Sequence, residues 1–256
     1  MNLKLLDKNH INTALISATL ICLVWLSWCI SPHAYGSFND IAPSRTPAQY
    51  NNQYASKYRS NTDTTKANVA SNIETYIDTD QYRIDYYLGK NAPFITLRAT
   101  LWLPINSEQF YRLLTDPKHV MQWLDHVALV WPLTLDEAGR SIVLTRLTGE
   151  GPVSSRYMIT QSRLIQPTEG EFSLYISDAI EHHLTNYPAI RMSDIDMAWH
   201  AKQDSDGVQV SYSGSLKPNG KIPAWLANRA ALQSFATSLE NLIGEAQKEA
   251  KISSKR

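Results

Sequence analysis

The stretch that decides the fold reads Tyr212-Ser-Gly-Ser-Leu-Lys-Pro218-Asn-Gly220-Lys-Ile222-Pro223-Ala-Trp225-Leu226-Ala-Asn228. Its first residues continue a run with the period of two that is typical of a β-strand. Asn219-Gly220 allows the positive-φ turn that ends a strand, and Pro223 fits the first turn of a helix, where its missing N–H costs nothing. The stretch therefore predicts a strand, a turn and a helix of fixed direction, with Trp225 and Leu226 entering the core at once.

The predicted helix runs from Pro223 to about Lys248. Its apolar residues recur at intervals of three and four, which gives the segment one apolar face. These residues are Trp225, Leu226, Leu232, Phe235, Leu239, Leu242 and Ile243. The helix therefore needs a broad apolar surface to cover.

The preceding segments supply that surface. Residues 82–88 and 95–103 alternate apolar and polar side chains on either side of the turn-forming residues 89–93, which predicts a hairpin. Asn106 or Ser107 can cap a short helix, and Asp116-Pro117 begins a second one that runs to about Leu124. Strand-like runs follow at residues 127–135, 140–147, 155–166, 171–177, 193–203 and 208–216.

The predicted order is a hairpin, two short helices, a six-strand meander and one long helix. A curved antiparallel sheet of this size has a concave face that must be covered, and the long helix is the element that can cover it. The predicted fold class is therefore α+β: a helix-grip fold, in which a curved antiparallel β-sheet wraps around a long C-terminal α-helix, with two short helices after the first hairpin.

The quoted stretch resembles the signature of the START (steroidogenic-acute-regulatory-related lipid-transfer) domain family. In that signature a strand ends in a Pro-x-Gly turn and the helix opens with Ile-Pro-x-Trp-Leu-x-Asn. Residues 151–156, Gly-Pro-Val-Ser-Ser-Arg, are similar to the family's Trp-Pro-x-Ser-x-Arg-Asp turn, with departures at Gly151 and Tyr157, and residues 188–191 are similar to its Pro-x-x-x-x-Val-Arg. The resemblance covers about residues 73–247 and implies a module that binds lipid in an internal cavity.

A cavity is expected because the space between such a sheet and its helix is too large for side chains to fill. Arg156 and Arg191 match family positions, and an Arg on an inward face needs a carboxylate or a ligand head group as its partner. The candidate ligand-binding residues are Leu97, Ala99, Leu101, Ile142, Leu144, Arg156, Ile159, Phe172, Leu174, Arg191, Met197, Trp199, Val210, Tyr212, Leu232 and Phe235.

Catalytic patterns are few in this sequence. Asp194 and Asp196 share one face of a predicted strand, but that face continues with polar residues and is expected to be solvent-exposed. His182 and His183 are neighbours that would point in opposite directions on a strand, which makes a poor metal site. The sequence has no phosphate-binding glycine loop, nucleophile elbow or zinc helix motif. We therefore expect a protein that is not an enzyme and that uses no cofactor or metal.

The charge and the cysteine content exclude some kinds of partner and some kinds of chemistry. The chain has 24 Lys and Arg residues against 24 Asp and Glu residues, so it lacks the clustered positive charge that binding to nucleic acid requires. Its cysteines, Cys22 and Cys29, both fall in an apolar segment near the N-terminus. The predicted folded part therefore contains no disulfide and no thiolate nucleophile.

The N-terminus has the pattern of an export signal. Lys4 and Lys8 precede an apolar run at residues 14–30, and Ala34-Tyr35-Gly36 suits a signal peptidase, whereas the run also nearly spans a bilayer. Both alternatives are open. The predicted organisation is a signal peptide or membrane anchor at 1–36, a disordered polar linker at 37–72, a START-like domain at 73–248 and a disordered tail at 249–256.

The leading hypothesis is a non-catalytic protein that transports or senses a lipid or other apolar molecule in the bacterial periplasm. It would be soluble after cleavage, or anchored to the inner membrane by residues 14–30. The rival hypothesis is an enzyme of the wider helix-grip superfamily, which includes polyketide cyclases and aromatase-like proteins, acting on an apolar substrate in the same cavity. A third hypothesis is an interaction module without a cavity. In that case Leu144→Trp would change the stability of the protein, and no ligand binding would be found at all.

Overall fold

The computed structural model describes residues 72–135, 141–149 and 153–254. These ranges do not include the predicted leader, nearly all of the predicted linker, or Gly151-Pro152 of the family-like turn. The described strands are β1 (Glu74–Asp78), β2 (Tyr82–Leu88), β3 (Ile95–Leu103), β4 (Val127–Leu135), β5 (Ser141–Leu147), β6 (Arg156–Thr168), β7 (Glu171–Asp178), β8 (Ile190–Arg191), β9 (Ser193–Gln203) and β10 (Val208–Lys217). The described helices are α2 (Ser107–Thr115), α3 (Pro117–Trp123) and α4 (Ala224–Ser253).

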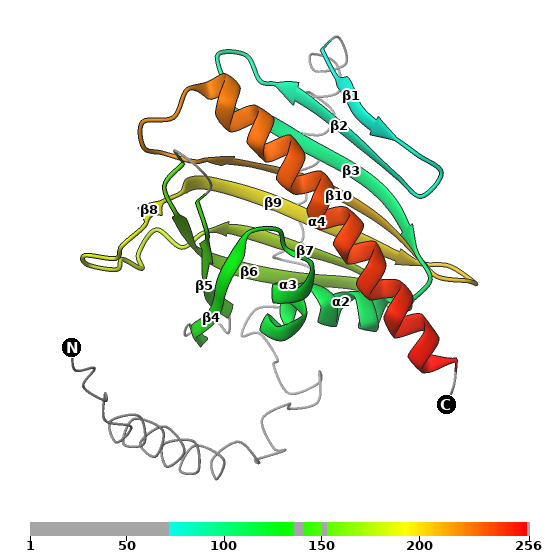
Figure 1. The fold of residues 1–256 in the computed structure, drawn as a ribbon. Helices are drawn as coiled ribbons and strands as arrows, with labels where there is room; N and C mark the ends of the chain where they lie inside the picture. Colours follow the sequence, from blue (N-terminus) through cyan, green and yellow to red (C-terminus); the bar gives the residue numbers. More distant parts are fainter. Residues whose placement is uncertain (1–71, 136–140, 150–152, 255–256) are drawn as a thin grey trace, which may run out of the picture. The chain divides into compact units, whose positions relative to one another are not determined.

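The strands form one sheet with the order β1-β2-β3-β10-β9-β7-β6-β5-β4, and β8 pairs with β6 beside this path. The neighbours along the path are antiparallel, and the two ends of the domain meet at the β3–β10 pair, where Leu103 lies opposite Val208 and Leu97 lies opposite Gly214. α4 crosses in front of this sheet, with α2 and α3 packed near its lower half (Figure 1). The predicted helix-grip fold is confirmed.

Local signals explain most element boundaries. Asn106 and Gln109 form a capping box at the start of α2, because each side chain accepts a hydrogen bond from the other residue's backbone N–H, at 2.8 and 3.0 Å. Asp116 ends α2 and caps α3 by accepting a hydrogen bond from Lys118 N at 2.9 Å. β1 and β8 were not expected from the sequence, and α4 continues to Ser253, past the expected end at Lys248.

The core fills only part of the space beneath α4. Phe110 and Leu113 of α2 and Leu239 and Leu242 of α4 are fully buried against the sheet. Aromatic rings pack against each other in this region. The ring centroids of Phe110 and Phe172 are 5.8 Å apart, a spacing typical of packed aromatic pairs. We call this region, toward the C-terminal part of α4, the filled half.

A second cluster of buried side chains lies on the convex face of the sheet. It contains Ile142, Leu144, Tyr157, Ile159 and Ala179, with Leu184, Tyr187 and Ala189 packed against it. Residues 179–189 link β7 to β8 and supply half of these side chains. This loop gives β5 and β6 an apolar surface to bury on the side away from α4.

Candidate functional site

A cavity of about 950 Å³ lies between the N-terminal part of α4 and the concave face of the sheet. α3 and the strands β4, β5 and β6 line its other sides. Its volume lies near the upper end of the range for small-molecule sites, about 300–1,000 Å³. We call this region the hollow half.

Small side chains of α4 create the hollow. Ala227, Ala230, Ala231 and Ser234 recur at intervals of three and four and line the cavity, whereas bulky residues occupy the helix further along. Further along the helix, Leu239, Leu242 and Ile243 are buried and do not line the cavity.

Strands β3, β7, β9 and β10 form an apolar wall. The predicted residues Leu97, Leu174, Met197, Trp199 and Tyr212 lie on this wall. Phe235 faces it from α4, with its ring 4.8 Å from that of Tyr212. The structure brings these six predicted residues together, and their contact with a ligand stays a prediction.

Gly214 keeps room for the Tyr212 side chain. A Cβ atom at Gly214 would stand 2.0 Å from the Tyr212 hydroxyl oxygen, so the phenol lies directly over the glycine. Burial raises the pKa of this hydroxyl, with a smaller contribution from Asp196. The phenol therefore keeps its proton and can donate a hydrogen bond.

Four predicted cavity residues lie in the filled half instead. Ala99, Leu101, Phe172 and Val210 have the predicted inward orientation, but they pack against α2 and the C-terminal part of α4. These positions were wrong as cavity residues because α2 inserts Phe110 beneath the helix at this level. The inward face of a strand alone does not show which part of it is covered by protein.

The predicted faces of β5 and β6 were wrong. Ile142, Leu144 and Ile159 lie on the convex face, in the cluster that the 179–189 loop covers. The alternate residues of the two strands line the cavity: Ser141, Val143, Thr145, Leu147, Arg156, Met158, Thr160 and Ser162. Because Leu144 points away from the cavity, Leu144→Trp would not test whether the cavity binds a ligand.

Arg156 borders the cavity, and its guanidinium is bound to the backbone. It donates hydrogen bonds to the carbonyl oxygens of Pro218 at 3.0 Å, Ser154 at 2.7 Å and Asn219 at 3.4 Å. Burial lowers its pKa. Since Pro218 and Asn219 belong to the turn before α4, Arg156 fastens the start of β6 to the start of the helix.

Arg191 does not line the cavity. Its guanidinium binds the last residue of β7, through Asp178 Oδ1 at 3.2 Å, and the loop that follows, through the Ala179 carbonyl at 3.1 Å and the His182 carbonyl at 2.7 Å. The prediction that Arg191 lies in the cavity was therefore wrong, because its side chain holds the loop that covers the convex face. Arg146 also lies on that face, with its guanidinium carbon 6.0 Å from the centre of the Tyr187 ring.

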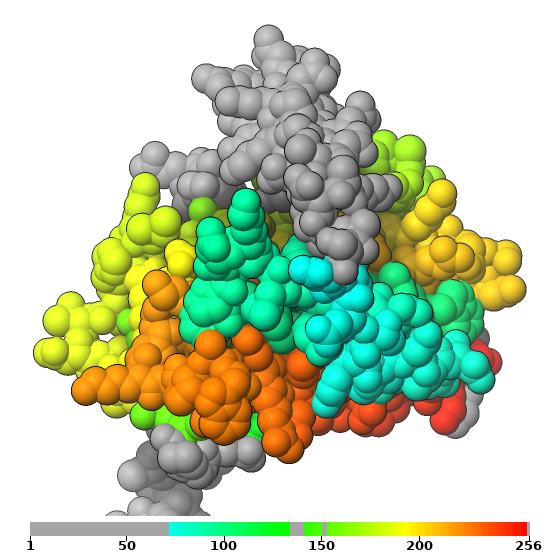
Figure 2. All heavy atoms as spheres, turned by 90° about the horizontal axis from the view of Figure 1, so that it is seen from above, coloured from blue at the N-terminus to red at the C-terminus, as the bar shows by residue number. Residues whose placement is uncertain are grey.

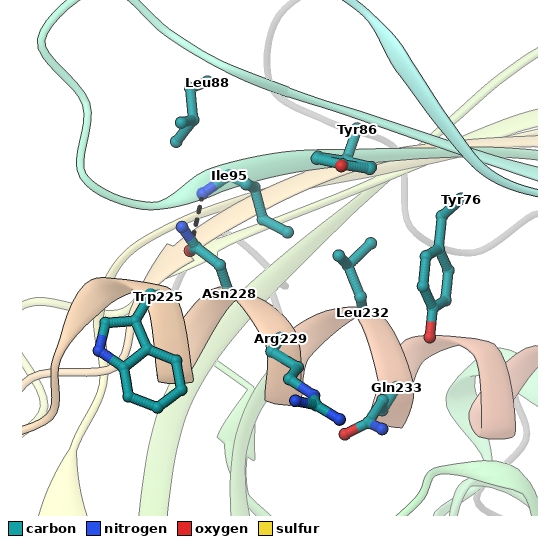
Figure 3. Close-up of a pocket in the computed structure, with 9 residues that line it drawn as sticks. All are labelled: Tyr76, Tyr86, Leu88, Ile95, Trp225, Asn228, Arg229, Leu232 and Gln233. Carbon is teal, nitrogen blue, oxygen red and sulfur yellow. Dashed lines mark hydrogen bonds between the residues drawn. The ribbon is translucent and has the colours of Figure 1, made fainter.

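Leu232 lines a separate, shallower groove of about 470 Å³ between α4 and strands β1 and β2. In Figure 3, Leu232 points from α4 toward Tyr86, and the Asn228 side chain accepts a hydrogen bond from Ile95 N at 3.2 Å. Trp225 borders the same groove and is 68% exposed, so the expectation that it enters the core was wrong. Figure 2 shows β1 and β2 (cyan) beside α4 (orange to red) from above.

Sequence reasoning missed several polar residues of the cavity. Thr145 and Thr160 project into it from β5 and β6, and Asp125 and His126 border it between α3 and β4. His126 Nε2 lies 3.1 Å from Asp125 Oδ2, and His126 has a φ of 56°. The adjacent Asp-His pair after a predicted short helix was the signal that could have been followed.

Two further features are absent from the described part of the chain: a metal-binding group and a membrane-spanning helix. Among residues 72–135, 141–149 and 153–254, no three His, Cys, Asp or Glu side chains are grouped so as to hold a metal ion. No helix within the same ranges combines the length and apolar character needed to cross a membrane.

The sequence matches no protein-family model and no curated protein, but the fold matches solved structures. The STAR-related lipid transfer protein of Xanthomonas axonopodis has a TM-score of 0.62 and 19% identity, over 69% of this chain and 99% of that one. Human StAR-related lipid transfer protein 5 has a TM-score of 0.64 and 9% identity, over 77% and 98%. Human STARD10 has a TM-score of 0.60 and 11% identity, over 72% and 77%. The chain therefore has the helix-grip fold of START domains.

Proposed function

We propose that this protein binds a lipid or another apolar small molecule in the hollow half and carries or senses it without changing it chemically. The observation that supports this most directly is the cavity of about 950 Å³ with its apolar wall beneath α4. Structures with the same fold are named as lipid transfer proteins. Removal of apolar ligand surface from water, at about 25 cal/mol per Å², would supply the binding free energy.

We also propose that the domain works on the exported side of a membrane. The support is in the sequence: two lysines followed by the apolar run at residues 14–30. Fusing residues 1–46 to a reporter that is active only in the periplasm would test this. Reporter activity is expected, and a reporter that stays in the cytoplasm would contradict the location without affecting lipid binding.

The test of the function is to identify what the protein carries. The full chain is expressed in bacteria, purified without detergent and analysed by native mass spectrometry and solvent extraction. We expect an intact lipid in stoichiometric amount, and Ala231→Trp should lower that amount because the indole would occupy the cavity. Lys248→Trp, an exposed change on the same helix, is the matched control. An empty wild-type protein that also takes up no lipid from vesicles would contradict the proposal.

One observation favours the second candidate, an enzyme of the wider helix-grip superfamily such as a polyketide cyclase or an aromatase-like protein. The Asp125–His126 pair borders the cavity, and a carboxylate that orients a histidine is a common arrangement for general acid–base catalysis. His126→Gln distinguishes the two functions. A carrier should keep its lipid in this variant, whereas an enzyme should lose turnover of the bound compound while still binding it.

A further inference from the structure

The two walls of the cavity differ in chemistry. The wall of β3, β7, β9 and β10 is mainly apolar, whereas β5 and β6 place four hydroxyl-bearing side chains on the cavity face. These are Ser141 and Thr145 of β5 and Thr160 and Ser162 of β6. We call this surface the hydroxyl wall.

Two of these hydroxyl groups belong to buried residues and face the cavity without a hydrogen-bond partner from the described part of the chain. Thr145 is 5% exposed and Thr160 is 8% exposed. Within the described part of the chain, neither side chain forms a hydrogen bond with another residue, and neither oxygen is fully enclosed by protein, so both face the cavity. A hydroxyl that an apolar ligand covers without a hydrogen bond costs about 1–3 kcal/mol, so a ligand with a polar group at this place avoids that cost.

The register places the two threonines within reach of one ligand group. Thr160 pairs with Val143 and Thr145 pairs with Met158, so the threonines are diagonal neighbours on one face of the sheet. Diagonal neighbours lie about 7–8 Å apart, near enough for one hydroxyl, alone or with a water molecule, to bond to both.

The charged groups of the cavity lie elsewhere and are already bound. Arg156 is four residues from Thr160 along β6, and its guanidinium donates to three backbone carbonyls. Asp125 and His126 contact each other beyond the end of β5. An anionic group on the hydroxyl wall would lose its hydration without gaining a counterion, which strongly disfavours it.

The volume limits the rest of the ligand. At about 30 Å³ for each water-sized group, a cavity of about 950 Å³ holds on the order of 30 non-hydrogen atoms. This fits one alkyl chain or one fused-ring skeleton better than a phospholipid with two long chains.

We propose that the ligand is an uncharged lipid alcohol whose hydroxyl group binds Thr145 and Thr160, with its hydrocarbon part against the apolar wall. This inference rests on the proposed function and adds to it the polarity and size of the ligand. Thr145 and Thr160 then determine specificity: they favour an alcohol over a hydrocarbon or a carboxylate of the same length.

The test compares three probes of equal chain length: octadecanol, stearic acid and octadecane. Each is presented in phosphatidylcholine vesicles to the delipidated full chain, and bound probe is quantified by mass spectrometry after gel filtration. Wild type should bind octadecanol about tenfold more tightly than octadecane, which corresponds to about one hydrogen bond. The double variant Thr145→Val and Thr160→Val should lose this preference and still bind octadecane. Thr100→Val, an outward threonine of β3, should behave as wild type.

The possible failures are distinguishable. If wild type binds octadecanol and octadecane equally, the hydroxyl wall is overturned and the proposed function still stands. The same holds if the preference for octadecanol survives in the double valine variant. Tightest binding of stearic acid, lost in Arg156→Met, overturns it in favour of an anionic ligand. If wild type binds none of the three probes, the hydroxyl wall is overturned, and the proposed function is overturned with it only if the purified protein also carries no lipid.

Discussion

The filled half and the hollow half lie beneath the same helix and against the same sheet, yet one is packed and the other is open. In the filled half, Leu239 and Leu242 of α4 meet Phe110 of α2. In the hollow half, the corresponding face of α4 carries Ala227 and Ala231, and Tyr111 of α2 lines the cavity wall. The size of the side chains beneath α4 therefore decides which part of this space remains empty.

This difference assigns separate roles to the two halves. Large apolar side chains in close contact stabilise the native state, and their removal is costly because it leaves a cavity. The residues around an existing cavity have already lost part of that contact. Stability should therefore depend mainly on the filled half, and ligand binding mainly on the hollow half.

Truncation of leucine should have the largest effect and should separate the halves. Leu242 is fully buried, so Leu242→Ala should lower the free energy of unfolding by about 3 kcal/mol. The same change at Leu226, which borders the cavity, should cost about 1 kcal/mol or less. Urea unfolding of both variants measures the difference, and equal losses would show that the two halves are packed alike.

Enlargement of alanine should give the opposite pattern. Ala246→Trp places an indole in the filled half and should destabilise the protein by about 1–3 kcal/mol through overpacking. Ala231→Trp points into the cavity and should leave the unfolding free energy nearly unchanged while reducing lipid binding at least tenfold. Thermal unfolding and lipid uptake measure the two effects. A strong loss of stability in Ala231→Trp would contradict the open space beneath the helix.

Loss of the Arg156 side chain should loosen the hollow half locally. Arg156→Met removes three hydrogen bonds to backbone carbonyls, two of them in the turn before α4, at a cost of about 1–3 kcal/mol. Amide hydrogen exchange should accelerate at residues 219–226 and remain slow at 239–246. Arg98→Met, an exposed change on β3, serves as the control. Uniform acceleration along α4 would contradict a local role.

The smallest expected effect concerns how α4 is fastened near the filled half. The Tyr82 hydroxyl donates a 2.8 Å hydrogen bond to Glu240 Oε1, and burial together with this carboxylate raises its pKa to about 12, from an ordinary 10.0. A raised tyrosine pKa means that the stabilisation is complete below pH 10 and is lost as the pH rises through 12.

Tyr82→Phe should therefore cost about 1 kcal/mol at pH 8, and the difference from wild type should vanish near pH 12. Urea unfolding at several pH values measures it, with Tyr87→Phe as the control on the same strand. A difference that persists unchanged at pH 12 would show that the hydrogen bond to Glu240 does not contribute.

The sequence predicted the fold well because its signals are local. The hairpin of β2 and β3, the capped helices α2 and α3, and the turn into α4 each depend on neighbouring residues, and the structure has them at the predicted positions. β1 was missed because its short run, residues 74–78, has only one partly buried side chain.

The site was harder to predict because it depends on contacts between distant parts of the chain. The alternation in β5 and β6 shows that each strand has two faces, but it does not show which face meets α4. The face that was expected to line the cavity is instead covered by the 179–189 loop. The small residues at 227–234 of α4 were visible in the sequence. They indicate a hollow only once the sheet opposite them is known.

The pairing of β3 with β10 also determines when the centre of the sheet can form during synthesis. It joins residues 97–103 to residues 208–214, with α2, α3 and most of the meander between them. Until β10 leaves the ribosome, β3 has an unpaired edge at the centre of the future sheet, and its apolar side chains have no helix above them. Pairing between such distant segments is slow, so the nascent chain is exposed to aggregation until residues 208–214 have been synthesised.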